Sequence, residues 1–189
     1  VAVKVQYPFA KHVLLADLRA LSISLRLAGV VLPGLLAAPV VDELRLRAGE
    51  ELDYLHEAKA QRAVAQAFAD SRDYAIPGVV AVGDGVLVSE WLEGRPLVTA
   101  ADASDAERRR IGALYQGFAL LAPARAGWLH ADPHPGNFRV TPDGRLGVMD
   151  FGAVVAMPEG LPPAFGRLVR AFADESSADD AHAALVGAG

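Results

Sequence analysis

The chain has 189 residues and a formal net charge of −5, an acidic balance that argues against a nucleic-acid partner because phosphate binding needs a basic surface. Hydrophobic residues make up 52% of the chain and charged residues 22%, which is typical of a globular protein with a substantial core and excludes disorder and collagen-like repeats. The absence of cysteine excludes disulfides, thiolate zinc sites and cysteine nucleophiles.

The first half of the chain mixes strand and helix patterns. Residues 1–6 alternate like a strand, and apolar residues three or four apart predict a helix over 11–27. Prolines and a glycine then break the pattern, and a long helix is expected over about 41–70. Two β-rich runs, 76–82 and 86–91, flank Gly-Asp-Gly and predict a hairpin. A chain that opens inside a strand, with no charged leader, is expected to be a piece of a longer protein without a signal peptide.

The second half is expected to be mostly helical. Ser104 and Glu107 form a capping box for a helix over 105–122, which Pro123 should stop. A loop rich in Pro, Gly and His follows, and then two short strands, 138–141 and 146–149, joined by Pro-Asp-Gly. Further helices are expected over 163–173 and 178–186.

These elements predict an α+β fold of two lobes with a ligand cleft between them. Residues 1–92 would form an incomplete, sheet-containing N-terminal lobe, and residues 93–189 a mostly helical C-terminal lobe. The longest uncharged stretches, 29–41 and 111–124, are shorter than the roughly 20 residues of a membrane span. We therefore expect a cytoplasmic protein or one attached peripherally to a membrane.

The sharpest motif lies in the loop 128–138. His130, Asp132 and Asn137 have the spacing H-x-D-x-x-x-x-N of a kinase catalytic loop. In such a loop the aspartate accepts or orients the proton of an attacking hydroxyl or water, and the asparagine oxygen reaches a metal ion. The alternative, that Asp132 only caps a turn, becomes weak once a second motif follows in order.

That second motif is Asp150-Phe151-Gly152, which follows a predicted strand thirteen residues after Asn137. An aspartate in this tripeptide places a hard carboxylate oxygen on Mg²⁺. The tripeptide alone recurs by chance, but both motifs in this order, separated by a hairpin, predict a nucleotide and Mg²⁺ site.

Lys4 stands in Val-Ala-Val-Lys, which is close to the strand pattern whose lysine holds the α- and β-phosphates. Its partner should be a helical glutamate. Glu50, Asp53 and Glu57 share one helical stripe, so Asp53 and Glu57 can face the same cleft. Glu51 points away on a regular helix and could serve the site only if the helix is distorted or begins there. For Glu50 an ordinary solvated face is the simpler interpretation.

The run 86–92 resembles the hinge between two lobes. There the C=O of Glu90 and the N–H of Leu92 would pair with the adenine edge, and Ser89 would be the small residue at the back of the pocket. For Trp91, core packing is at least as plausible as ligand contact.

Two other clusters have simpler interpretations. His130 and His134 could be zinc ligands, but Pro133 prevents a regular helix and no third ligand has suitable spacing, so His130 is better explained as bracing the loop. The run Arg108–Arg110 is most simply a solvated helix face, with partner or lipid binding as the alternative.

Together these residues resemble the ABC1/UbiB group, also called ADCK, of atypical protein-kinase-like proteins. Ala-Asp-Pro-His-Pro-Gly-Asn at 131–137 is the most specific part. Four blocks match in family order: residues 1–8, 51–58, 86–94, and 127–137 closing with 150–152. The family's upstream K-x-G-Q helix and alanine-rich nucleotide loop are absent from this chain, and Ala60 stands where the family usually has Asn.

The resemblance implies a protein-kinase-like fold that binds ATP with Mg²⁺. It places the family's E-x-D motif on Glu51 and Asp53, which joins them to the expected metal ligands Asn137 and Asp150, and it places the lysine-pairing glutamate on Glu57. It also implies a link to ubiquinone or related isoprenoid-quinone biosynthesis, with a lipid or quinone-precursor ligand and peripheral membrane contact.

The leading hypothesis is an ATP- and Mg²⁺-dependent enzyme that hydrolyses ATP or transfers phosphate to a small molecule or lipid. Asp132, Lys4 and Glu57 would be its catalytic residues. The rival is a non-catalytic nucleotide-sensing module that regulates a quinone-synthesis complex. A third reading, an aminoglycoside-type phosphotransferase, shares the catalytic loop, but the Glu-Leu-Asp-Tyr block and the Asp-Phe-Gly motif argue against it.

Overall fold

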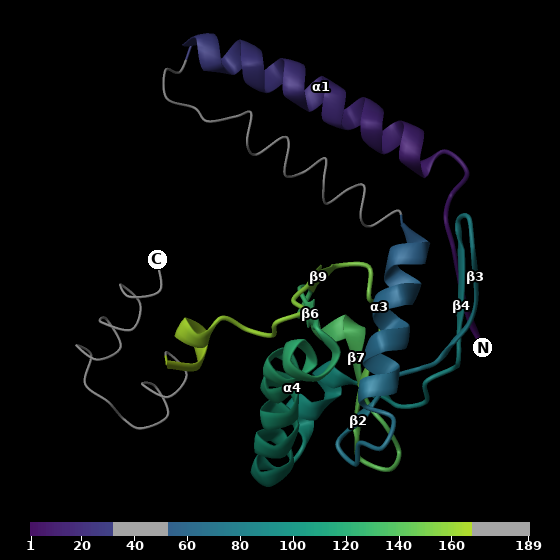
Figure 1. Ribbon diagram of the computed structural model, residues 1–189, viewed down its shortest axis with the longest axis vertical. Coiled ribbons are helices and arrows are strands. Elements are labelled where there is room, and N and C mark those ends of the chain that lie inside the picture. The colour runs from purple at the N-terminus through teal and green to yellow at the C-terminus, as the bar shows by residue number, and fades with distance from the viewer. Residues whose placement is uncertain (32–52, 168–189) are drawn as a thin grey trace.

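The computed structural model describes residues 1–31 and 53–167 (Figure 1). Two expectations lie partly or wholly outside these residues: the first part of the helix predicted over 41–70, and the C-terminal helices beyond residue 167. Glu50 and Glu51 also lie outside them.

The N-terminal part is a three-stranded antiparallel sheet covered by one helix. The sheet has the order β1-β4-β3, formed by β1 (Ala2–Val5), β4 (Val86–Ser89) and β3 (Val79–Gly83). The predicted hairpin is confirmed, and Gly85 turns it with a φ of 73°, a conformation that favours glycine. The register places Lys4 opposite Leu87, on the strand that leads to the expected hinge.

Helix α3 (Tyr54–Ala67) packs on this sheet and starts at an N-cap, Asp53. Its Tyr54 and Ala58 form a small buried cluster with Leu87 of β4. The opposite end of α3 enters the main core. Helix α1 (Ala10–Val31), predicted over 11–27, extends beyond the N-terminal end of α3 and away from α4 (Figure 1).

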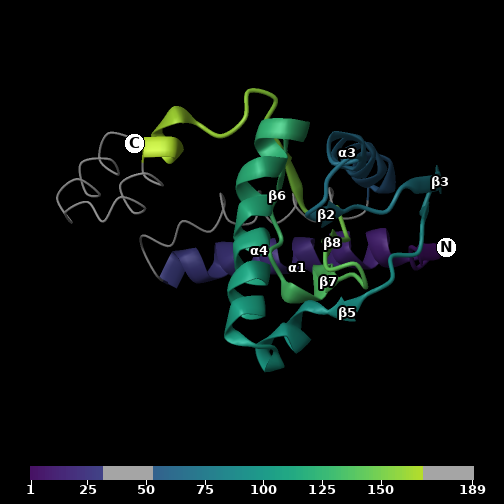
Figure 2. The ribbon, with the colours of Figure 1, turned by 90° about the horizontal axis from the view of Figure 1, so that it is seen from below.

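The C-terminal part combines one long helix with short strands (Figure 2). A mixed four-stranded sheet has the order β2-β8-β7-β5, and β6 pairs with β9. Its elements are β2 (Tyr74–Ala75), β5 (Arg95–Pro96), the 3-10 helix η1 (Leu97–Asp102), α4 (Asp105–Ala126), β6 (Trp128–His130), the 3-10 helix η2 (Pro135–Asn137), β7 (Phe138–Val140), β8 (Leu146–Val148) and β9 (Val154–Ala156).

The main core joins α3 and α4 to these strands and lies directly under the two motif loops. Phe118 of α4 and Phe151 of the Asp-Phe-Gly motif are each 1% exposed within it. The ring of His130 packs edge-on against Phe151, with centroids 5.5 Å apart. Because the motif residues take part in the close-packed core, their backbones are held in place.

Two expectations for this part were wrong in detail. Pro123 does not stop its helix: α4 continues to Ala126 and ends at Gly127, which has a φ of 70° and donates its N–H to the C=O of Pro123 at 3.0 Å. The proline side chain is fully buried, and this burial offsets the missing amide hydrogen in the last turn. The segment 128–130, expected as loop, is strand β6, which is too short to show an alternating pattern.

The helices within 1–31 and 53–167 are all too short or too polar to cross a lipid bilayer.

Candidate active site

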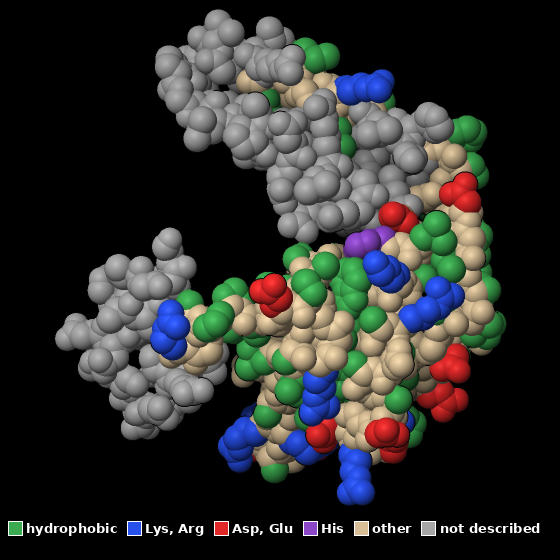
Figure 3. All heavy atoms as spheres, in the orientation of Figure 1, with side chains coloured by type: hydrophobic (Ala, Val, Ile, Leu, Met, Phe, Trp, Pro, Cys, Tyr) green, Lys and Arg blue, Asp and Glu red, His purple; other side chains and the backbone are tan. Residues whose placement is uncertain are grey.

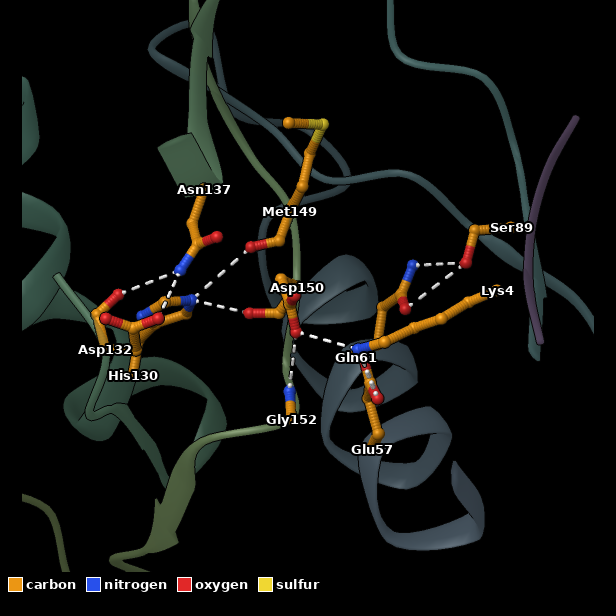
Figure 4. Close-up of polar contacts among 10 residues, drawn as sticks. All are labelled: Lys4, Glu57, Gln61, Ser89, His130, Asp132, Asn137, Met149, Asp150 and Gly152. Atoms are coloured by element: carbon orange, nitrogen blue, oxygen red, sulfur yellow. Dashed lines mark hydrogen bonds and ion pairs between the residues drawn. The ribbon is translucent and has the colours of Figure 1, made fainter. Parts of the chain in front are cut away.

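One ammonium group joins the three parts of the site. The Nζ of Lys4 on β1 lies 2.9 and 3.0 Å from the two carboxylate oxygens of Glu57 on α3, and 3.0 Å from Oδ1 of Asp150 (Figure 4). Residues 4, 57 and 150 are therefore adjacent in space although they are far apart in the chain. The sheet, the helix and the Asp-Phe-Gly turn meet at this point.

Local structure explains why these side chains converge. Side chains alternate along β1, so Lys4 points toward the cleft while Val3 and Val5 are exposed on the other face. Glu57 lies in the first turn of α3 and is 2% exposed. Asp150 has a φ of 57°, rare for a non-glycine residue, and its Oδ1 also accepts the N–H of Gly152 at 3.1 Å.

The charges shift one another's pKa values. Burial lowers the pKa of Lys4, but Glu57 and Asp150 together outweigh burial, so its pKa is raised. Burial raises the pKa of Glu57 against the effect of Lys4. Burial would also raise the pKa of Asp150, but the Lys4 ammonium and the Gly152 N–H hold it below its usual range. Asp150 is therefore kept ionised more firmly than its neighbour Glu57, as a cation ligand requires.

The catalytic loop borders the same cleft through Gly136 and Asn137, and Asp132 is held beside Asn137. The Nδ2 of Asn137 donates to Oδ2 of Asp132 at 2.7 Å, and the N–H of His134 donates to Oδ1 of Asp132 at 3.2 Å. The Nε2 of His130 donates to the C=O of Asp150 at 2.8 Å, since a carbonyl oxygen can only accept. His130 thus braces one motif against the other, whereas the Nδ1 of His134 accepts the N–H of Gly136.

A cleft of about 270 Å³ lies between the sheet and these loops. Its walls include the hinge residues singled out from the sequence, Ser89, Glu90 and Leu92, together with Lys4, Glu57, Asn137 and Asp150. The C=O of Glu90 and the N–H of Leu92 form no backbone hydrogen bond within the described residues. Both groups are free to pair with a ligand edge.

Two residues that line the cleft, Gln61 and Arg139, were not predicted from the sequence. Gln61 is 3% exposed and donates its Nε2 to the C=O of Pro77 at 2.7 Å and to Oγ of Ser89 at 3.0 Å. Arg139 of β7 lines the cleft and donates to the C=O of Gly94 at 2.9 Å. No motif marks either residue: Gln61 is one helical turn after Glu57 and Arg139 is two strand positions after Asn137, relations that become informative only once the helix and the short strand are known.

Other singled-out residues lie outside the cleft or at its rim. Asp53 is exposed and caps α3, its Oδ1 accepting the N–H groups of residues 55 and 56 at 3.0 Å. It is not among the residues that line the cleft. Trp91, for which core packing was one expectation, is 64% exposed and lines the cleft.

The arginine run lies at the N-terminal end of α4, where basic and acidic side chains are mixed (Figure 3). Arg108 pairs with Asp105, and Arg110 pairs with Glu107 and the C=O of Gly144. Arg109 is exposed. This geometry is that of a solvated helix face.

The donor atoms suit a hard cation that is shared with a phosphate ligand. Asn137 turns its Nδ2 to Asp132, so its amide oxygen is left for a metal. Lys4 and Gly152 both contact Oδ1 of Asp150, so Oδ2 of Asp150 is left for the same metal. Within residues 1–31 and 53–167 no three His, Asp or Glu side chains converge as a metal cage. Mg²⁺ is commonly held by one or two protein oxygens plus substrate phosphates, which fits this set.

Comparison with known proteins agrees with the geometry. The solved structure of Rv3197 from Mycobacterium tuberculosis, in complex with erythromycin, superposes with a TM-score of 0.83 at 39% identity over 99% of this chain and 48% of that one. ACTIVITY OF BC1 COMPLEX KINASE 1, a chloroplastic protein of Arabidopsis thaliana, is 35% identical over 84% of this chain and 24% of its own length. AarF domain-containing kinase 1 of Drosophila melanogaster is 32% identical over 79% of this chain and 30% of its own length.

The chain thus spans less than a third of the length of these curated relatives. The family model described as the ABC1 atypical kinase-like domain matches residues 1–179. This match confirms the resemblance of the motifs and the kinase-like α+β fold. The chain belongs to the ABC1 family of atypical kinase-like proteins.

Proposed function

We propose that the protein binds ATP with Mg²⁺ and either hydrolyses it or transfers its terminal phosphate to a small molecule or lipid. The observation that carries this proposal is the contact of one ammonium, Lys4 Nζ, with both Glu57 and Asp150. Kinase-type phosphate transfer needs a strand lysine, paired with a helical glutamate, beside the metal-binding aspartate.

In this proposal each charged group has one task. Glu57 is buried and fixes the direction of Lys4. The three donors of the ammonium meet Glu57 twice and Asp150 once, so a phosphate oxygen would share or replace the contact with Asp150. Because the pair is preformed, little reorganisation accompanies nucleotide binding. The hinge C=O of Glu90 and N–H of Leu92 would pair with the adenine edge, with Ser89 behind them.

Asp150 and Asn137 would hold Mg²⁺. The ion would neutralise charge that develops on the transferred phosphate. Asp132 would orient the attacking hydroxyl or water by accepting its hydrogen bond, and Asn137 fixes the position of that carboxylate. The family resemblance also implies Glu51 and Asp53 as metal ligands, but Asp53 caps α3 and does not line the cleft, so we assign the metal to Asp150 and Asn137.

One observation favours the rival function of a nucleotide sensor without turnover. Both carboxylate oxygens of Asp132 already accept hydrogen bonds, from His134 N–H and Asn137 Nδ2, so an attacking hydroxyl or water would have to share an acceptor that is already engaged. A sensor would keep the pocket and the metal but would release no phosphate.

We also infer from the resemblance that the whole protein takes part in isoprenoid-quinone biosynthesis, with a lipid or quinone-precursor ligand and peripheral membrane attachment. The support for this part is membership of the ABC1 family.

Steady-state phosphate release from Mg-ATP tests the proposal. Wild type should release phosphate, Asp132→Ala should lose at least tenfold in turnover while it keeps ADP affinity, and the exposed aspartate variant Asp143→Ala should behave as wild type. If the protein binds nucleotide but shows no phosphate release that is lost in Asp132→Ala, the result would establish the nucleotide-sensor function. Absence of nucleotide binding by the wild type would overturn both functions.

A further inference from the structure

Arg139 is a cation in the nucleotide cleft that has no carboxylate partner among residues 1–31 and 53–167. One of its terminal nitrogens donates to the C=O of Gly94 at 2.9 Å, and no Asp or Glu oxygen of the described residues lies within ion-pair distance. Lys4, the other cation that lines the cleft, has two carboxylates. A half-buried charge without a counter-charge is costly unless a ligand supplies compensation.

The strand pattern fixes the direction of this side chain. Phe138 and Val140 of β7 are buried in the protein core, so Asn137 and Arg139 point to the opposite side, into the cleft. On the facing wall, Ala2 precedes Lys4 by two residues on β1 and therefore lies on the same side of that strand. The cleft thus has Ala2 on one wall and Arg139 on the other.

Arg139 lies at the hinge end of the cleft rather than at the phosphate end. Its guanidinium is bonded to Gly94, two residues after Leu92, and its Cβ is close enough to Gly94 that a Cβ built there would lie 3.2 Å away. The register of β5 and β7 also places Arg139 opposite Pro96, just beyond the hinge. The phosphate groups, by contrast, would lie at Lys4 and Asp150.

We propose that the guanidinium of Arg139 stacks on the face of the nucleobase and is a main binding residue for it, an inference that rests on the proposed nucleotide function. A planar, weakly hydrated guanidinium stacks well on aromatic rings, and the contact strengthens when water is excluded. The hydrogen bond to Gly94 holds the plane in place before the ligand arrives. Arg139 then compensates its charge with the π-face of the base instead of a carboxylate.

The experiment is calorimetric titration of purified protein with adenosine and with ADP, without Mg²⁺. Arg139→Leu should weaken both ligands by the same factor, about 3- to 30-fold, because the lost contact is to the base. Arg139→Lys keeps the charge but not the plane and should weaken both by a smaller factor. Arg109→Leu, an exposed arginine outside the cleft, is the matched control and should bind as wild type.

Three results would overturn the inference. Weaker binding of ADP alone would show that Arg139 meets phosphate rather than base. Unchanged or tighter binding of both ligands by a folded Arg139→Leu variant, with folding verified by circular dichroism, would show that the guanidinium does not contribute. If the wild type binds neither ligand, the proposed function itself fails and the inference with it, and this result is distinguishable from the other two.

Discussion

Gln61 of α3 and Ser89 at the end of β4 are hydrogen-bonded at the back of the cleft, with Nε2 and Oγ 3.0 Å apart. The second hydrogen of the same Nε2 goes to the C=O of Pro77 at 2.7 Å. Gln61 follows Glu57 by one helical turn. Gln61 therefore connects β4, the strand that leads to the hinge, with α3, the helix that also carries Glu57, the partner of Lys4.

Replacing Gln61 should affect both stability and ligand binding. Gln61→Leu leaves the C=O of Pro77 without its donor, and we expect the free energy of unfolding to fall by about 1–3 kcal/mol. ADP affinity should fall several-fold because α3 can then turn Glu57 away from Lys4. Urea denaturation and ADP titration measure the two effects. Gln66→Leu, an exposed glutamine of the same helix, is the control, and equal behaviour of the two variants would contradict the prediction.

The Lys4 pair gives a prediction for pH. Glu57 has a raised pKa in the folded protein, so its contribution to stability is greatest below its ordinary value of 4.5 and declines as pH rises through the folded value. In Lys4→Met the lysine no longer lowers that pKa, so the decline moves to higher pH. The variant should be less stable than wild type by about 1–3 kcal/mol near neutrality, since Lys4 is partly exposed, and the difference should shrink toward about pH 5.

Urea denaturation between about pH 5 and about pH 8 checks this expectation. The double variant Lys4→Met with Glu57→Gln removes Glu57 as a titrating group but keeps Asp150, whose pKa Lys4 also lowers. Its stability difference from wild type should therefore vary less with pH than that of the single variant. The prediction would be contradicted if Lys4→Met were as much less stable than wild type at the acid end of this range as it is near neutrality.

Gly147 and Leu92 make the hinge sensitive to a single methyl group. A Cβ at Gly147 would lie 2.5 Å from Cδ2 of Leu92, so Gly147→Ala must displace the leucine side chain from its place on the cleft wall. We expect ADP affinity to fall several-fold. The free energy of unfolding should fall only slightly, because the displaced atom ends a flexible side chain. Gly83→Ala, where a Cβ meets nothing within 4 Å, should bind as wild type. Equal ADP affinities for the two variants would show that the position of Leu92 does not matter.

Asp53 offers a test between two roles. As the N-cap of α3 it accepts two backbone N–H groups, a task that asparagine performs equally well. The geometry predicts that Asp53→Asn keeps wild-type stability and Mg-ADP affinity, whereas Asp53→Ala loses about 0.5–2 kcal/mol of stability. Thermal unfolding and Mg-ADP titration decide the matter. A selective loss of Mg-ADP affinity in Asp53→Asn would instead make this carboxylate a metal ligand.

The sequence predicted best what depends on spacing. Asp132, Asn137 and Asp150 were singled out because the chemistry demands fixed residue types at fixed intervals. Helical geometry placed Glu57 on a stripe with other acidic residues, and the family resemblance named it as the partner of Lys4. The hairpin at Gly85 was predictable because few residues accept its backbone conformation.

What the sequence did not reveal depends on tertiary context. Arg139 sits in the cleft only because β7 buries Phe138 on its other face, and a three-residue strand carries no visible pattern. Pro123 continues its helix because the fold buries the ring, which no local rule describes. Gln61 gains its role from Pro77 and Ser89, which lie 16 and 28 residues further along the chain.

The Mg²⁺ dependence of ADP binding tests the central claim most directly, because that claim places a metal-phosphate site at Lys4 and Asp150. Calorimetric titration with and without Mg²⁺ should show that the ion tightens ADP binding by wild type at least tenfold. Asp150→Asn should abolish this gain while ADP without Mg²⁺ binds as well or better, since a negative charge beside the phosphates is gone. The exposed control Asp143→Asn should keep the gain. An equal gain in wild type and in Asp150→Asn would contradict the account.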